Sequence, residues 1–242
     1  MTMPSSHSEA SEIHQIFWPF KGKELSEIPA FATNVNETQE FCKIHNYQYK
    51  LWNLEDCENL IKEDFSEYLD LWKDFRFDIQ RCDFIRYCIL YKFGGLYIDC
   101  DIRPMKNLDL VFSSLETEEQ LYFVHWADDI KRLPYNAIMG SASPSRKQNN
   151  NLFLEIIKQC KKDYYEKSKI EKYKEWKGRF IFQTTGHSML QRVMKKNKID
   201  KDKYFHDVLY IRNETKNNGG VGDLNTALFY DVNASVWFDN LI

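Results

Sequence analysis

Hydrophobic positions recur along the chain with two spacings, and these spacings separate the predicted helices from the predicted strands. Apolar residues three or four positions apart predict a helix over 78–93, which Gly94 and Gly95 would end. Short apolar or alternating runs predict strands at 13–18, 47–52, 96–98, 121–125 and 208–211. Helical spacing predicts further helices at 32–45, 54–62, 66–75, 152–174 and 186–196. Strands that alternate with helices are typical of an α/β fold with a mixed, mainly parallel sheet flanked by helices.

The composition fits one compact domain. The 242 residues are 43% hydrophobic, which is enough apolar material for a large core. We expect a disordered, polar lead-in over 1–11 and a single domain over 12–242, because no repeat or low-complexity linker interrupts the chain. The sequence shows neither signal-peptide features nor an apolar run long enough to span a membrane. The six cysteines form no C-x-x-C pair, so reduced thiols in a cytoplasmic protein are expected.

The charge pattern narrows the possible partners. The net charge of −3 argues against a dedicated nucleic-acid binder, which is usually strongly basic. The region 158–179 nevertheless holds nine basic and four acidic side chains. A solvated helix face is the favoured interpretation of this region. The alternative is a patch that meets an anionic acceptor or anionic lipid, which would place the protein at the periphery of a membrane.

The strongest chemical signal is the segment 94–101, with the sequence GGLYIDCD. Two glycines end a helix, a short apolar strand follows, and Asp99 and Asp101 stand at its carboxyl end, where ligands bind in open α/β sheets. If the backbone stays extended, the two carboxylates point to the same side and converge on one cation. If it turns, they serve different parts of one ligand. Carboxylates together with substrate phosphates are the oxygen ligands that Mg²⁺ or Mn²⁺ prefers.

Asp83 and Arg86 add a second candidate pair, three residues apart on the helix before this motif. A surface salt bridge is the simplest explanation and would contribute little. Because the helix is otherwise strongly apolar and mostly buried, the alternative hypothesis is that this charged pair binds a polar ligand. A carboxylate holds sugar hydroxyls, and a guanidinium holds hydroxyls or phosphate.

These residues together resemble a known family. The pattern D-x-x-R, L-Y, G-G-x-Y-x-D-x-D over 83–101 is similar to the sugar-binding region of DxD glycosyltransferases. They include the mannosyltransferases and capsular polysaccharide transferases of glycosyltransferase family 32 and the glucosyltransferase domains of large clostridial toxins. The segments 13–18, 136–141 and 184–186 resemble the family's first strand, its central N-A segment and its T-G turn. The tail at 233–237 resembles the N-x-S-x-W segment that closes the toxin domains, although the toxins are much larger than this chain.

The resemblance implies a GT-A (Rossmann-like) fold, a Mn²⁺ or Mg²⁺ cofactor, and hexose transfer from a nucleotide diphosphate sugar with retention of configuration. It implies that Asp101 and Asn233 bind the metal, that Asp99 contacts the ribose and the sugar and has a water-mediated link to the metal, and that Asp99, Asp101 and Arg86 form the catalytic set. The implied donor-binding residues are Phe17 or Trp18 at the base, Asp83 and Arg86 at the sugar, Tyr97 lining the site, and Ser235 and Trp237 at the diphosphate. The tail favours a UDP-sugar, with GDP-mannose second, and the acceptor is a glycan, a lipid-linked saccharide or a protein.

No catalytic base is assigned, because a retaining transfer can proceed by front-face attack with the β-phosphate oxygen taking the proton. His187, next to the T-G turn, is expected to be structural rather than catalytic. Two other functions compete: a nucleotide-sugar-binding module that has lost catalysis, and a phosphohydrolase with Asp99 as the aspartyl nucleophile. Such phosphohydrolases usually continue D-x-D-x-[TV], whereas Asp101 is followed by Ile102, Arg103 and Pro104.

Overall fold

The structure is a computed structural model. It describes residues 11–19, 22–116, 121–125, 134–142, 152–199, 205–206, 210–212 and 228–232. Residues 1–10 of the predicted lead-in lie outside these ranges, and the extent of the predicted single domain stays a prediction. At the start of the described part, the carbonyl of Ser11 accepts a hydrogen bond of 2.9 Å from the amide of Gln48.

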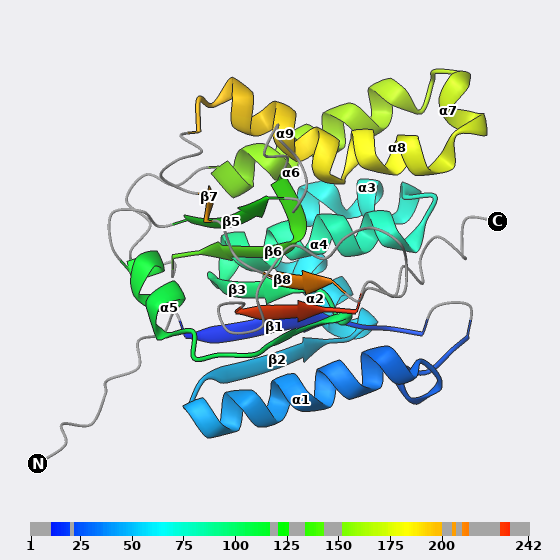
Figure 1. Ribbon diagram of the computed structural model, residues 1–242. Helices are drawn as coiled ribbons and strands as arrows, with labels where there is room; N and C mark the ends of the chain where they lie inside the picture. Colours follow the sequence, from blue (N-terminus) through cyan, green and yellow to red (C-terminus); the bar gives the residue numbers. More distant parts are fainter. Residues whose placement is uncertain are drawn as a thin grey trace, which may run out of the picture.

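A six-stranded mixed sheet organises the described part of the chain (Figure 1). Its order is β2 (Gln48–Trp52), β1 (Glu12–Ile16), β3 (Gly95–Ile98), β6 (Pro134–Ser141), β5 (Leu121–His125) and β7 (Phe205–His206). The strands β2, β1 and β3 are parallel, β6 runs antiparallel to both β3 and β5, and β7 is parallel to β5. The predicted mixed, mainly parallel sheet is therefore confirmed.

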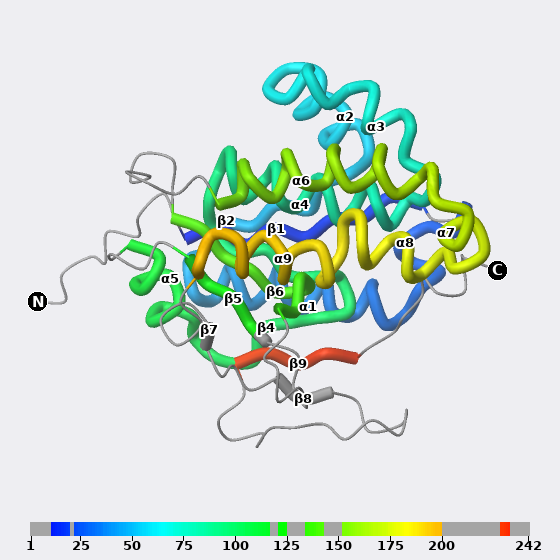
Figure 2. Tube along the Cα trace, turned by 90° about the horizontal axis from the view of Figure 1, so that it is seen from above, coloured from blue at the N-terminus to red at the C-terminus, as the bar shows by residue number. Residues whose placement is uncertain are grey.

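Helices cover one face of this sheet. They are α2 (Leu54–Asp64), α3 (Leu69–Asp74), α4 (Asp78–Lys92), α6 (Leu152–Lys167), α8 (Lys177–Thr184) and α9 (His187–Lys196). Their apolar residues share a core cluster with the side chains of Tyr97 and Phe123. Figure 2 shows α4 and α6 on the side of the sheet opposite β9.

The other face carries α5 (Asp109–Glu116) and a small second sheet, with α1 (Pro29–His45) packed beside β2 and β4. The second sheet has the order β4 (Ile102–Pro104), β9 (Phe229–Asp231) and β8 (Tyr210–Arg212). On this face, the side chains of Leu96 and Ile98 pack in a second core cluster with residues of α5 and β9. Tyr97, between them in the strand, packs in the first core cluster on the opposite face. Because alternate side chains of β3 pack against apolar layers on both faces of the sheet, the sequence of β3 is a continuous apolar run.

Most predicted elements are present within one to three residues of their expected ends. The predicted helix 152–174 is an exception, because α6 ends at Lys167 and a short helix, α7 (Lys172–Glu175), follows. The predicted helix 66–75 begins as a 3₁₀ turn, Ser66–Tyr68, and continues as α3. A second 3₁₀ turn, Leu25–Glu27, precedes α1.

Candidate active site

The D-x-D segment forms a turn between the two sheets. The amide of Asp99 donates to the carbonyl of Ala137 at 2.9 Å, which continues the pairing of β3 with β6. The amide of Ile102 then donates to the carbonyl of Asp99, also at 2.9 Å, and closes a four-residue turn. Of the two backbone arrangements that the sequence left open, the turned one is present. The two carboxylates are therefore presented from different positions of a turn.

Gln15 anchors this turn from the neighbouring strand. Its side chain is fully buried, and its amide nitrogen donates to the carbonyls of Asp99 and Ile102, each at 3.2 Å. The hydroxyl of Tyr49 donates to the side-chain oxygen of Gln15 at 2.9 Å and fixes the orientation of the amide. Sequence reasoning did not single out Gln15. The available signal was a glutamine within the apolar first strand, because a buried amide needs partners.

Asp83 and Arg86 form a buried ion pair, and Arg86 connects the pair to the D-x-D turn. One guanidinium nitrogen of Arg86 lies 3.2 Å from Asp83, and the other lies 3.1 Å from Asp99. The side chains of Asp83 and Arg86 are only 5% and 3% exposed, whereas that of Asp99 is 31% exposed. The pair is thus not the surface salt bridge of the simplest interpretation. The network leads from the protein interior to a carboxylate that solvent can reach.

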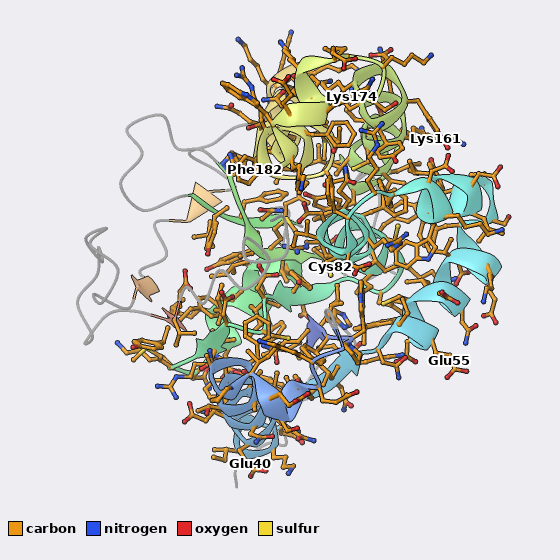
Figure 3. The ribbon with its side chains drawn as sticks, turned by 90° about the vertical axis from the view of Figure 1, so that its right-hand side faces the viewer. Glu40, Glu55, Cys82, Lys161, Lys174 and Phe182 are labelled. Atoms are coloured by element: carbon orange, nitrogen blue, oxygen red, sulfur yellow. The ribbon has the colours of Figure 1, made fainter. Side chains whose placement is uncertain are left out.

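Further bonds fix the guanidinium of Arg86. Its Nε donates to the carbonyl of Cys82 at 3.2 Å, and Nη1 donates to the carbonyl of Asn136 at 2.8 Å. The guanidinium also lies over the ring of Tyr97, 4.7 Å from its centroid, and the hydroxyl of Tyr97 donates to Asp99 at 2.5 Å. Cys82, which lies on α4 one turn before Arg86, is labelled near the centre of Figure 3. Arg86, Tyr97 and Asp99 are therefore held as one rigid unit.

Two segments that the sequence placed in the site meet at Asp83. The side-chain amide of Asn136 donates to one carboxylate oxygen at 2.9 Å, and the hydroxyl of Thr185 donates to the other at 3.0 Å. A Cβ added at Gly186 would lie 3.6 Å from that second oxygen, so the T-G turn packs directly against Asp83. The N-A segment and the T-G turn thus complete the shell around the predicted sugar-binding carboxylate.

Burial and neighbouring charges have opposing effects on the pKa values of Asp83 and Arg86. Burial raises the pKa of Asp83 to about 6, although Arg86 and the hydrogen bond from Thr185 oppose the shift. Burial alone would lower the pKa of Arg86, but Asp99, Tyr97 and Asp83 hold it well above its ordinary value. Arg86 is consequently a permanent cation, whereas Asp83 changes its charge within the range of ordinary assay buffers.

The two candidates for the base platform are both buried. Trp18 packs against Trp72 in the first core cluster, with ring centroids 6.4 Å apart. Phe17 packs edge-on against Phe31 at 6.3 Å and shares a cluster with Cys100, the central residue of the D-x-D turn. A role for either ring at the base stays a prediction, and the position of Phe17 beside Cys100 makes it the first choice.

The predicted tail contacts at Asn233, Ser235 and Trp237 lie outside the described residues. The described part of the tail ends at Val232, whose amide donates to the carbonyl of Asp101 at 2.9 Å. Just before it, Asp231 is fully buried and accepts a hydrogen bond of 2.9 Å from the hydroxyl of Tyr135. The chain therefore reaches the D-x-D turn one residue before Asn233.

The chemistry of the D-x-D turn fits a hard divalent cation. Asp99 and Asp101 supply carboxylate oxygens, which Mg²⁺ and Mn²⁺ prefer. Within the described ranges, no group of three or more His, Cys, Asp or Glu side chains is placed to hold a metal ion. Two carboxylates are a partial ligand set, of the kind that Mg²⁺ completes with substrate phosphates and water rather than with a protein cage.

The remaining predictions concern a histidine and the cysteines. His187 packs against the ring of Phe182 with centroids 4.5 Å apart, and burial lowers its pKa. All six cysteines are free and buried, as expected for reduced thiols. No helix in the described part of the chain is long and apolar enough to cross a membrane.

Part of the chain, including the D-x-D segment, is similar to known glycosyltransferases. Residues 32–122 match the family described as a glycosyltransferase sugar-binding region containing a DXD motif. Mannosyl phosphorylinositol ceramide synthase SUR1 of Saccharomyces cerevisiae is 31% identical over 135 residues, which are 46% of this chain and 34% of that protein. Inositol phosphoceramide mannosyltransferase 3 of Schizosaccharomyces pombe is 38% identical over 64 residues, which are 26% of this chain and 18% of that protein. The chain therefore matches about a third or less of the length of these relatives.

A solved structure supports the same fold. The PaToxG glycosyltransferase superposes with a TM-score of 0.51 at 12% identity, over 77% of this chain and 69% of that one. At such low identity the likeness concerns the fold alone. Residues 32–122 are therefore similar to the DXD-containing sugar-binding region of glycosyltransferases, and the described architecture is similar to the fold of a solved glycosyltransferase.

Proposed function

We propose that the chain transfers a hexose from a nucleotide diphosphate sugar to a hydroxyl acceptor, with retention of configuration and with a divalent metal at the D-x-D turn. The observation that carries the proposal is the buried network from Asp83 through Arg86 to Asp99. A charged network with low exposure is costly unless its members are paired, and this one ends at a solvent-reachable carboxylate beside Asp101. Such an arrangement suits a site that holds a polar, charged ligand.

The residues have separate roles in this proposal. Asp83 holds hydroxyls of the transferred sugar, and Arg86 holds both that carboxylate and Asp99 in place. Asp99 contacts the ribose and the sugar, with a water-mediated link to the metal, and Tyr97 lines the donor site. Asp101 is the direct metal ligand. Val232, hydrogen-bonded to Asp101, supports the proposal that the next residue, Asn233, joins the ligand set, with Ser235 and Trp237 at the diphosphate.

Charge stabilisation and positioning supply the catalysis. A bound Mn²⁺ or Mg²⁺ neutralises negative charge on a diphosphate leaving group. The acceptor oxygen forms a bond to the anomeric carbon on the face from which the diphosphate leaves, and the hydroxyl proton passes to a β-phosphate oxygen. Arg86, fixed by four polar contacts and a ring, adds a preorganised positive charge to the same region. No side chain is needed as nucleophile or base.

The donor is the finer part of the proposal. One relative is named an inositol phosphoceramide mannosyltransferase and the other a mannosyl phosphorylinositol ceramide synthase, and the mannosyl group in both names favours GDP-mannose as the first donor to test. The tail segment 233–237 favours a UDP-sugar instead. The acceptor is a hydroxyl of a glycan, a lipid-linked saccharide or a protein.

A donor screen tests the proposal and separates its rivals. Thermal unfolding is measured with each nucleotide sugar in the presence and absence of Mn²⁺, because a ligand that binds only the native state raises stability. The best donor is then incubated with candidate acceptors, and the released nucleotide and the anomeric configuration of the product are determined. Saturable binding without hydrolysis or transfer indicates an inactive binding module. Covalent phosphate on Asp99 indicates the phosphohydrolase.

A further inference from the structure

An exposed apolar and basic segment runs from the end of α6 through α7 into the first turn of α8. The segment 169–179, here called the basic turn, presents Trp176 at 59% exposure and Ile170 at 41%. The large hydrophobic side chains exposed within the described ranges are Ile44, Leu54, Leu110, Ile170 and Trp176. The first three belong to three different helices, whereas the last two lie six residues apart in one turn. A single exposed apolar residue needs no explanation, but a tryptophan and an isoleucine together in one turn do.

The charge of the basic turn is opposite to that of the whole chain. It contains five basic and two acidic side chains, a net charge of +3, while the chain carries −3. The five basic side chains, all exposed, are Lys169, Lys172, Lys174, Lys177 and Arg179. One of them, Lys174, pairs with Glu171 at 2.8 Å, and Arg179 lies 5.4 Å from the ring of Trp176. The turn therefore surrounds an exposed indole with cations.

The turn is held in one conformation by its own backbone and by a buried anchor. The amide of Tyr173 donates to Ile170 at 3.0 Å, and the amide of Trp176 donates to Lys172 at 3.3 Å. The ring of Tyr173 is only 7% exposed and packs 6.0 Å from the ring of Phe180 in the first core cluster. An exposed tryptophan on a fixed turn loses little conformational entropy when it binds.

The basic turn and the candidate site lie toward the same edge of the sheet. The helix α8 begins directly after Trp176 and ends at Thr184, and the next residue, Thr185, bonds Asp83. In Figure 1, α7 lies on the right, the side toward which the β1 arrow points, and β3 runs parallel to β1 into the D-x-D turn. Figure 3 looks onto that side and shows Lys174 at its upper edge and Cys82 near its centre.

We propose that the basic turn docks the protein onto a bilayer that contains anionic lipid. Trp176 and Ile170 enter the interface, where an amphipathic indole is favoured, and the surrounding cations bind the anionic headgroups. Two signals, apolar insertion and a cluster of cations, are what stable but reversible membrane attachment requires. Docking in this orientation brings the candidate site toward an acceptor carried by the membrane. The docking itself is independent of the proposed function, because it needs neither donor nor metal.

Vesicle binding of the full chain, without donor, tests the proposal. Sedimentation with phosphatidylcholine vesicles is compared with sedimentation with vesicles containing roughly one third phosphatidylserine, an anionic surface of the kind that attracts basic segments. We expect binding only to the anionic vesicles, weakening as salt rises from about 0.05 to about 0.5 M. The variant Lys172→Glu/Lys174→Glu should lower the partition coefficient at least about tenfold. Trp176→Ala should lower it while the salt dependence is kept.

A matched charge change elsewhere controls for net charge. Lys43→Glu/Lys62→Glu alters the charge by the same amount on α1 and α2, where both lysines are exposed, and should bind vesicles like the parent chain. Brominated lipid should quench the tryptophan fluorescence of the parent chain and not that of Trp176→Phe. Equal losses in the two double variants, or equal binding to neutral vesicles, would overturn the proposal. Binding that needs the lysines but shows no quenching by brominated lipid would also overturn it, and would indicate a different anionic macromolecule.

Discussion

A guanidinium nitrogen of Arg86 lies 3.1 Å from a carboxylate oxygen of Asp99, and this contact joins the buried Asp83–Arg86 pair, proposed to hold the sugar, to the D-x-D turn. The other terminal nitrogen of Arg86 contacts Asp83. Only a planar fork reaches both carboxylates and the carbonyl of Asn136 at once. The spacing of the two acidic groups therefore depends on arginine at this position.

We expect Arg86→Lys to keep the positive charge but lose the bridge. A single ammonium cannot serve Asp83 and Asp99 in the same geometry, so turnover should fall on the order of 10²-fold, as when a charge stabiliser is lost. Steady-state kinetics with the best donor measure this effect. Arg86→Ala should additionally lower the free energy of unfolding by about 3–5 kcal/mol, because it leaves the buried carboxylate of Asp83 without its charged partner. Kinetics of Arg86→Lys equal to those of the parent chain would contradict the bridging role.

Asp83 should make stability depend on pH in a defined window. Its pKa is about 6 in the folded chain, above its ordinary value of 3.8, so the folded state binds more protons between these values. Stability contributed by the protonated carboxyl is fully present below about 4 and is lost as pH rises to about 6. The unfolding free energy of the parent chain relative to Asp83→Asn should fall across this window and level off above it. Denaturant titrations of both chains at each pH measure the difference, and a difference that rises with pH would contradict the assignment.

Donor affinity should show the opposite trend through the same group. If ionised Asp83 holds the sugar hydroxyls, the dissociation constant of the donor should decrease as pH passes about 6. Calorimetric titration of the donor over this range measures it. The variant Asp83→Asn should bind more weakly and show a flatter profile.

Local contacts of this site were predictable from the sequence, because short spacings fix them. Asp83 and Arg86 are three residues apart on one helix. Two glycines mark the end of that helix, and Asp99 and Asp101 come directly after the short strand that follows it. The contact of Thr185 with Asp83 joins residues 102 positions apart, and no periodicity encodes it. Only the resemblance to a family placed the T-G turn near the site.

Three of the elements that the sequence did not predict, α8, β4 and β9, depend on tertiary contacts. The helix α8, with the sequence KGRFIFQT, contains a glycine and β-branched residues that have low helix propensity. It forms because Phe180, Ile181 and Thr184 are buried against its neighbours, which is a tertiary effect. The strands β4 and β9 are three residues each, too short for a period-2 pattern, and they exist by pairing with each other.

Gln15 should position the metal ligands without touching the donor. Gln15→Met keeps the length of the side chain but removes both bonds to the carbonyls of Asp99 and Ile102. We expect a higher apparent dissociation constant for Mn²⁺ and a loss of stability of about 1–3 kcal/mol, because both carbonyls lose the hydrogen bond from the buried amide of Gln15. Tyr49→Phe is the matched control, since it removes the bond to Gln15 but leaves both carbonyl contacts. A loss of stability with unchanged Mn²⁺ affinity would reduce Gln15 to a structural role.

Gly95 should be irreplaceable for a steric reason. Its φ is +78°, and an added Cβ would lie 2.5 Å from the carbonyl oxygen of Glu12 on β1. Gly22 has a φ of +73° but no atom within 4 Å of its added Cβ. Gly22→Ala should cost about 1–2 kcal/mol for the left-handed backbone alone, and Gly95→Ala should cost more because β1 and β3 must also separate. Equal unfolding free energies of the two variants would contradict the close approach of the strands.

The most direct measurement of the central claim is the Mn²⁺ dependence of sugar transfer by the parent chain and by Asp101→Asn, with Asp70→Asn on the exposed surface of α3 as the control. We expect a chelator to abolish turnover of the parent chain and added Mn²⁺ to restore it. Asp101→Asn should lose on the order of 10²-fold in turnover at the same Mn²⁺ concentration, while Asp70→Asn behaves like the parent chain. Full turnover of Asp101→Asn with chelator present would contradict a metal-dependent D-x-D site.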